Sequence, residues 1–199
     1  MHTTKLPPFT SLTVNAEKLD FPFPADQNII LVGLMGAGKT TVGRQLARAL
    51  GRPFVDSDHE IEARMGVPIP TIFEIEGESG FRKRESQVIA DLVQLRGLVL
   101  ATGGGAVLNE ENRRCMHNNG WVVYLNVPPR QLFERTRTDR SRPLLQVADP
   151  LSRLQELHAI RDPLYRESAH IVIEGRRMGA SSVTQFLIKE FQKHANPDS

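Results

Sequence analysis

The fold of this chain is constrained most tightly by residues 33–40, Gly33-Leu34-Met35-Gly36-Ala37-Gly38-Lys39-Thr40, which match the pattern GxxxxGKT. An unbroken apolar run, 29–32, precedes the motif, and residues 41–50 follow it with helical spacing of their apolar side chains. This strand–loop–helix context is the one in which the pattern binds a nucleoside triphosphate. A glycine-rich turn that matches by chance is the alternative, but both flanks would then have to match by chance as well. We therefore predict triphosphate binding.

Two side chains of the motif have predicted chemical roles. Lys39 is placed to reach the β- and γ-phosphates, and the Thr40 hydroxyl is placed to ligate Mg²⁺. The glycines leave the backbone N–H groups and the helix N-terminus free to face the phosphates. The residues predicted to bind the nucleotide here are Gly36, Ala37, Gly38, Lys39, Thr40 and Thr41.

Composition narrows the class of protein. The chain has 199 residues, is 40% hydrophobic and carries a formal charge of +2, which indicates one domain without the electrostatic footprint of a nucleic-acid binder. Its apolar runs are shorter than the ~20 residues of a membrane span, and its N-terminus has neither signal-peptide nor transit-peptide character. The single cysteine, Cys115, fits a reducing compartment. We expect a cytoplasmic monomer with no nucleic-acid or membrane partner.

The chain divides into an N-terminal extension, 1–27, a domain, 28–195, and a short tail, 196–199. Apolar runs predict strands at 29–32, 54–55, 98–101, 121–125 and 170–174, and helical patterns occupy 41–50, 59–65, 70–76, 81–96, 110–118, 129–137, 151–169 and 181–194. This alternation predicts an α/β fold of three layers, in which helices cover both faces of a five-stranded parallel sheet. Ligands of such sheets bind at the carboxyl ends of the strands.

Acidic side chains and glycines follow two of the predicted strands. Asp56 and Asp58 come directly after the second strand, where one carboxylate can serve the metal and the other the acceptor hydroxyl. An N-cap pair for the next helix is the alternative. Gly103, Gly104 and Gly105 follow the third strand and offer unhindered backbone N–H groups, although a merely flexible loop is also possible.

Three arginines are candidates for binding anions: Arg82, Arg142 and Arg161. Arginine suits two-pronged recognition of carboxylate or phosphate, although each could instead be a solvated surface charge. Glu85 is spaced to pair with Arg82 on one helix. Arg142 lies in a proline-punctuated segment, about 138–150, that we predict to be a mobile lid.

Six motifs together make the chain similar to the shikimate kinases over residues 28–195. They are residues 33–40, Asp56-Ser57-Asp58, Phe81-Arg82-Lys83-Arg84-Glu85, the glycines at 103–105, Arg142-Pro143-Leu144-Leu145 and Arg161-Asp162-Pro163-Leu164-Tyr165. The first is common to P-loop proteins, and the other five are far more selective. The resemblance implies a P-loop kinase fold and ATP-dependent phosphorylation of the 3-hydroxyl of shikimate, a step of chorismate and aromatic amino acid biosynthesis.

The same resemblance implies a role for individual residues. Asp58 would bind the acceptor hydroxyl and act as base, and Asp56 would act on Mg²⁺ beside Thr40. Arg82 and Arg161 would hold the shikimate carboxylate in a pocket that the glycines at 103–105 line. Arg142 would neutralise charge on the transferred phosphoryl group. Arg135 and the loop around Arg177 would flank the adenine, although the chain has Met178 where the family often has proline.

Two other functions remain open at this point. A kinase of the gluconate type could use the same scaffold on another small molecule. A non-catalytic nucleotide-sensing module could have kept the phosphate loop, but it would need neither Asp58 nor the arginines of an acceptor site.

Overall fold

The computed structural model describes residues 26–139, 142–174 and 179–195, with side chains described as far as residue 191. Five strands form one parallel sheet in the order β2-β3-β1-β4-β5. The strands are β1 (Asn28–Val32), β2 (Phe54–Asp56), β3 (Val99–Ala101), β4 (Gly120–Asn126) and β5 (Ile171–Glu174). The predicted parallel α/β sheet is therefore confirmed.

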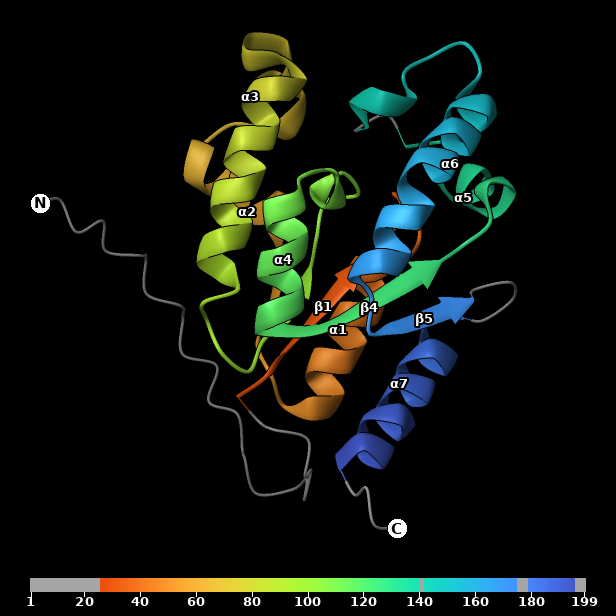
Figure 1. Cartoon of the computed structure of the whole chain (residues 1–199). Coiled ribbons are helices and arrows are strands. Elements are labelled where there is room, and N and C mark those ends of the chain that lie inside the picture. The colour runs from red at the N-terminus through yellow and green to blue at the C-terminus, as the bar shows by residue number, and fades with distance from the viewer. Residues whose placement is uncertain (1–25, 140–141, 175–178, 196–199) are drawn as a thin grey trace, which may run out of the picture.

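Helices cover both faces of this sheet (Figure 1). They are α1 (Lys39–Leu50), α2 (Ser57–Met65), α3 (Ile69–Leu92), α4 (Glu110–Asn119), α5 (Pro129–Thr136), α6 (Pro150–Ser168) and α7 (Ala180–Ala195), with single 3₁₀ turns η2 (Ala106–Leu108) and η3 (Pro143–Leu145). Helices α1 and α7 pack together on one side, and α4 and α6 lie beside β4 on the other. In Figure 1, α3 and the η3 region rise on opposite sides of the strand ends.

The central strand β1 is buried along its whole length. Its apolar run packs between the two helical layers, which is why no polar alternation appears in its sequence. Asn28 is the polar exception, and its amide donates to the carbonyls of Val93 (3.1 Å) and Leu95 (2.6 Å) and accepts from the N–H of Leu98 (3.1 Å). The start of β1 is thereby tied to the connection between α3 and β3.

Several predicted helix boundaries differ from those of the structure. The helix predicted to end at Arg96 ends at Leu92, because the residues that follow turn back and give their carbonyls to Asn28. The helix predicted from His59 begins at Ser57, because Asp56 caps it. The two helices predicted over 70–76 and 81–96 belong to the single element α3, which is interrupted at Gly77, where φ is 68°.

Two residues before β1 are held against the domain. The Asp26 carboxylate pairs with Arg96 at 2.9 Å, and the Gln27 side chain accepts from the indole of Trp121 at 2.7 Å. None of the helices in the described ranges is long and apolar enough to cross a membrane.

Candidate active site

One cleft of about 840 Å³ opens at the carboxyl ends of the strands, between α3 and η3. Every predicted site residue in the described ranges lines it. They are Gly36, Ala37, Gly38, Lys39, Thr40, Thr41, Asp56, Asp58, Arg82, Gly103, Gly104, Gly105, Arg135, Arg142 and Arg161. Arg177 lies outside the described residues. The parallel sheet has thus gathered side chains that are more than 100 positions apart in sequence.

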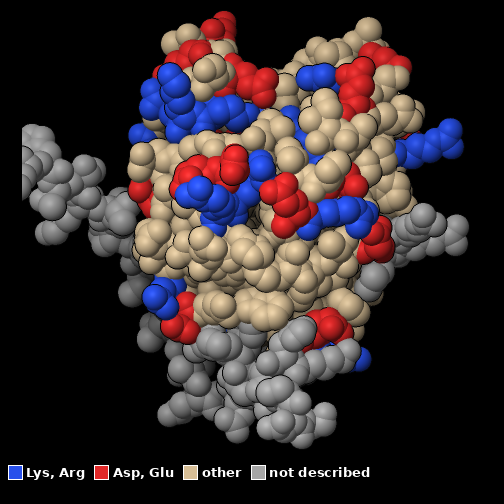
Figure 2. All heavy atoms as spheres, viewed as in Figure 1, with Lys and Arg blue, Asp and Glu red and all other residues tan. Residues whose placement is uncertain are grey.

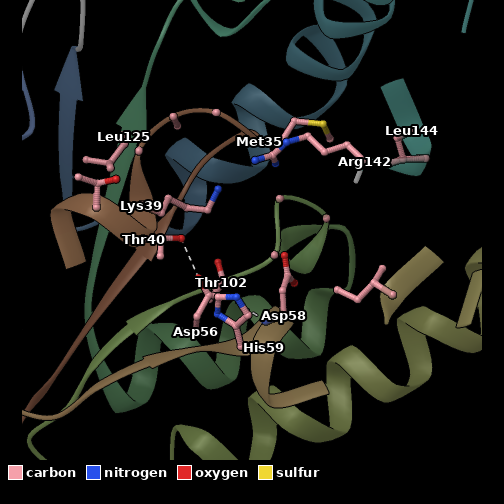
Figure 3. Close-up of a pocket in the computed structure, with 18 of the residues that line it drawn as sticks. Met35, Lys39, Thr40, Asp56, Asp58, His59, Thr102, Leu125, Arg142 and Leu144 are labelled. Carbon is pink, nitrogen blue, oxygen red and sulfur yellow. Dashed lines mark hydrogen bonds between the residues drawn. The ribbon is translucent and has the colours of Figure 1, made fainter. Parts of the chain in front are cut away.

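Lys39 begins α1 and extends into the cleft (Figure 3). Its ammonium group donates to the backbone oxygens of Gly33 (2.7 Å) and Leu34 (3.0 Å). Burial lowers the pKa of Lys39 to about 8, although the Asp58 carboxylate opposes the shift. A triphosphate in the loop offers this amine full negative charges in place of carbonyl dipoles, so the loop is suited to bind phosphate.

The Thr40 hydroxyl donates to Oδ2 of Asp56 at 2.7 Å, the dashed line in Figure 3. The other oxygen of Asp56 accepts from the N–H of Asp58 at 3.1 Å, so the predicted alternative of an N-cap is confirmed for Asp56. A hydroxyl and a carboxylate side by side are hard oxygen ligands of the kind that Mg²⁺ takes together with phosphate and water. Within the described ranges, no three His, Cys, Asp or Glu side chains gather as an all-protein metal cage.

Asp58 lies in the first turn of α2 and points up into the cleft in Figure 3. Its Oδ1 is buried and has no hydrogen-bond partner among the described residues. Burial raises the pKa of the Asp58 carboxyl, the neighbouring Asp56 adds to the shift, and Lys39 opposes it. A carboxylate in this environment is a better proton acceptor than one in water.

The glycines at 103–105 follow β3 and pack tightly against other cleft residues. A Cβ on Gly103 would lie 2.7 Å from Oδ1 of Asp58 and nearer still to Oε1 of Glu85. A Cβ on Gly105 would overlap the guanidinium of Arg82. The turn therefore needs glycine for close approach, and it is not a free flexible loop.

Arg82 and Glu85 form the predicted pair on α3, at 2.7 Å. Glu78 also pairs with Arg82, at 2.9 Å. Burial lowers the pKa of Arg82, but the two carboxylates outweigh it and the net shift is upward. Glu85 is 1% exposed, and burial raises its pKa; its Oε1 has no partner among the described residues.

Arg161 projects from α6 and is only 3% exposed, so the alternative of a solvated surface charge is wrong for it. Its guanidinium donates to the backbone oxygen of Gly104 at 3.2 Å, while Nε has no partner within the described part of the chain. Burial lowers its pKa. A buried guanidinium that forms no ion pair with a carboxylate of the described residues is costly unless an anion binds there, so this position is suited to bind an anion.

Arg142 and Arg135 lie on the opposite side of the cleft. Arg142 precedes η3 and pairs with Asp139 at 2.7 Å, and in Figure 3 it reaches over the space between Lys39 and Asp58. Arg135, in α5, donates to the backbone oxygen of Gly36 at 3.2 Å. Both arginines therefore flank the phosphate loop.

Two residues whose hydroxyls bond to the backbone of the turn at 103–105 were not among the predicted site residues, Ser57 and Tyr165. Ser57 accepts from the N–H of Gly103 at 2.9 Å, and Tyr165 donates to the backbone oxygen of Gly104. Both residues belong to motifs quoted above for the family resemblance. Their place in those motifs was the only sign of their importance in the sequence. Neither side chain has a charge that would have pointed to an anionic ligand.

Charged residues of both signs lie on the face of the molecule that carries the strand ends. Figure 2 shows basic and acidic residues over the upper part of the face in view, above a band with little charge.

A family model described as "Shikimate kinase" matches residues 35–192. A protein from Dechloromonas aromatica (strain RCB) named "Shikimate kinase" is 68% identical over 167 residues, which cover 84% of this chain and 91% of that protein. Another of the same name, from Burkholderia thailandensis, is 58% identical over 165 residues, or 83% of this chain and 90% of that protein.

Solved structures agree with the sequence comparisons. The shikimate kinase from Acinetobacter baumannii in complex with shikimate superposes with a TM-score of 0.84 at 51% identity, and the match covers 86% of this chain and 96% of that one. A gluconokinase from Sinorhizobium meliloti 1021 gives a TM-score of 0.53 at 16% identity, over 87% of this chain and 95% of that one, and so shares the fold alone.

Proposed function

This chain belongs to the shikimate kinase family and is an ATP-dependent kinase, and from that premise we propose that it transfers the γ-phosphate of ATP to the 3-hydroxyl of shikimate in the cleft described above. The acceptor half of the cleft distinguishes this reaction from other uses of a phosphate loop.

One observation carries the proposal. Asp58 Oδ1, Glu85 Oε1 and Arg161 Nε are buried, lack hydrogen-bond partners among the described residues, and belong to side chains that line one cleft. Buried polar atoms are almost always paired, so three such atoms in one cleft indicate a missing ligand. Two acceptors and one cationic donor match a ligand with hydroxyl groups and a carboxylate, which is the chemistry of shikimate.

In the proposed reaction, Asp58 accepts the proton of the acceptor hydroxyl as the oxygen attacks the γ-phosphorus, and the bond from the γ-phosphorus to the β–γ bridging oxygen breaks to release ADP. Burial raises the pKa of Asp58 and so favours this proton transfer, while Lys39 opposes the shift and favours the ionised carboxylate. Lys39 and Arg142 neutralise the charge that spreads over the equatorial phosphoryl oxygens. Arg82 and Arg161 hold the substrate carboxylate, with the glycines at 103–105 beside it, and orient the hydroxyl toward the phosphate.

We also propose Mg²⁺ as the cofactor, with Thr40 and Asp56 as the residues that hold it. The hydroxyl–carboxylate pair at 2.7 Å is the donor set that supports this assignment. When bound, the ion would offset the negative charge of the phosphates.

On the nucleotide side, we propose that Gly36, Ala37, Gly38, Lys39, Thr40 and Thr41 bind the phosphates. Arg135 and Arg177 would flank the adenine. The position of Arg142 over the cleft supports a lid for the segment around it. A monomer in the cytoplasm stays our prediction from the sequence.

The test is a coupled assay of ADP release with Mg²⁺, ATP and either shikimate or gluconate. We expect shikimate-dependent turnover whose product has gained one phosphate by mass, and no turnover with gluconate. Turnover with gluconate alone would instead support the gluconate-type alternative. ATP binding without turnover of either compound would support a nucleotide sensor.

A further inference from the structure

Most backbone N–H and C=O groups of the turn at 103–105 form hydrogen bonds, some with other backbone groups and some with side chains. The oxygens of Gly103 and Gly105 accept from the N–H groups of Ala106 (3.1 Å) and Leu108 (3.0 Å). The N–H of Gly103 donates to the Ser57 hydroxyl, and the oxygen of Gly104 accepts from the Tyr165 hydroxyl and from Arg161. Only the N–H groups of Gly104 and Gly105 lack an acceptor among the described residues, so they are available to a ligand.

Ser57 links the turn to the end of β2. Ser57 lies between Asp56 and Asp58 in sequence and is fully buried. Its hydroxyl contacts Gly103 and not the charged side chains of the cleft. Because Ser57 is the first residue of α2, the same helical turn that positions Asp58 also holds the glycine turn. A shift of one would therefore be passed to the other.

Tyr165 links the turn to α6. It lies one helical turn after Arg161, is 1% exposed, and donates to the same backbone oxygen as that arginine. Its ring stacks on that of Tyr124 at 4.7 Å, which prevents the hydroxyl from turning away. Burial raises the pKa of Tyr165, so the hydroxyl keeps the proton it donates.

We propose that Ser57 and Tyr165 are positioning residues for the acceptor substrate. Glycines place few limits on their own backbone, so the shape of this turn has to be set by bonds from outside. The two hydroxyls hold it from two sides, which keeps the free N–H groups and the Arg161 guanidinium in one geometry. This inference rests on the proposed function, because it concerns the binding of shikimate.

The first test is Tyr165→Phe, with Tyr124→Phe as a matched control. Both variants remove one buried hydroxyl from the same aromatic stack, but the Tyr124 hydroxyl bonds to Asp162 (2.9 Å) and not to the turn. We expect Tyr165→Phe to raise the shikimate KM about tenfold, with kcat changed less than about threefold and the MgATP KM unchanged. Tyr124→Phe should leave the shikimate KM within about twofold of the parent.

The second test is Ser57→Ala, with Ser57→Thr as the rescue. Alanine removes the acceptor of the Gly103 N–H and should also raise the shikimate KM about tenfold, whereas threonine keeps a hydroxyl and should restore most of the affinity. Ser168→Ala is the control, because among the described residues that buried hydroxyl bonds only to Leu164, within its own helix. Ser57→Ala combined with Tyr165→Phe should raise KM by less than the product of the single effects, because both act on one turn.

The activity of the wild type distinguishes a failure of the proposed function from a failure of the positioning role of Ser57 and Tyr165. If the wild type does not phosphorylate shikimate, the proposed function fails first. If it does, and the folded variants keep the parental shikimate KM, then Ser57 and Tyr165 do not position the substrate. An equal rise in KM for both tyrosine variants would also overturn the inference, since packing and not the Tyr165 hydroxyl would then be responsible.

Discussion

The Thr40 hydroxyl and the Asp56 carboxylate are joined by a 2.7 Å hydrogen bond that connects the first turn of α1 to the end of β2. The bond brings together two hard oxygens that are 16 positions apart in sequence. The proposed metal site is thus preorganised by the sheet, and only phosphate and water ligands have to be added.

Asp56→Asn tests this metal site. The amide oxygen keeps the cap on α2 but loses the charge, so the fold should survive. We expect the Mg²⁺ concentration for half-maximal rate to rise by about 10- to 100-fold at fixed ATP. Asp91→Asn, which removes an exposed carboxylate of α3 that pairs with Arg64, serves as the control. An unchanged Mg²⁺ requirement would remove Asp56 from the metal site.

Asp58→Asn tests the base. The variant should lower kcat by about 10²- to 10⁴-fold, because the amide cannot accept the hydroxyl proton. The Kd of MgATP, measured by calorimetric titration, should change little, since Asp58 belongs to the acceptor side of the cleft. Turnover at the parental rate would exclude the role.

Arg161→Ala tests the anion site on α6. Loss of a buried guanidinium that faces a substrate carboxylate should raise the shikimate KM by about 30-fold or more. Arg166→Ala provides the comparison on the same helix, because that arginine is 45% exposed and pairs with Asp162 and Glu174. If both variants had the same small effect, Arg161 would not contact the substrate.

The lowered pKa of Lys39 predicts an alkaline limit for nucleotide binding. In the free enzyme Lys39 loses its charge as the pH rises through about 8, so kcat/KM for MgATP should fall between about pH 7 and pH 9. Bound phosphate raises the pKa of the Lys39 amine. The alkaline decrease in kcat should therefore lie at higher pH than the decrease in kcat/KM. In Lys39→Arg, nucleotide affinity should be weaker but flat over this range. A flat profile for the wild type would contradict the assignment.

His170 predicts a loss of stability in acid. Its ring stacks on that of His117 at 4.1 Å, and its Nδ1 accepts from the N–H of Val122 at 3.1 Å. Burial, together with His117, lowers the pKa of His170, so the unfolded chain binds the proton more readily. The contribution of neutral His170 to the free energy of unfolding is intact above the ordinary histidine pKa of about 6.5. It is lost as the pH falls through the lower pKa that His170 has in the folded protein.

Thermal unfolding from pH 7 to pH 5 measures this effect. The Tm of the wild type should fall more than that of His170→Asn, which cannot be protonated there. His59→Asn, at an exposed position, should follow the wild type. Equal slopes for His170→Asn and the wild type would show that the acid sensitivity arises elsewhere.

Most of the fold follows from local patterns. Continuous apolar runs separated by helical patterns predict the parallel sheet. A strand that helices cover on both faces is apolar along its whole length, so its run shows no alternation. Helix ends are harder, since they depend on distant partners. The end of α3 is set by Asn28, far away in sequence, and no pattern near Leu92 contains that information.

The residues of the site also divide into those that local sequence patterns predict and those that depend on distant partners. Charges and glycines at strand ends pointed to the cleft, and the resemblance supplied their roles. Burial decided between the alternatives: Arg161 alone could have been a surface charge, but at 3% exposure it is not. Ser57 and Tyr165 could not be predicted, because a hydroxyl that bonds to backbone leaves no mark in composition or spacing.

The close packing at Gly103 and Gly105 has a consequence for inhibitors. A compound anchored on this turn would meet a surface that changes only if a neighbouring side chain moves. A Cβ at either position would have to displace the Asp58 and Glu85 carboxylates or the Arg82 guanidinium, all of which line the cleft where shikimate is proposed to bind. A substitution here that excluded the compound is therefore expected to weaken the binding of shikimate as well.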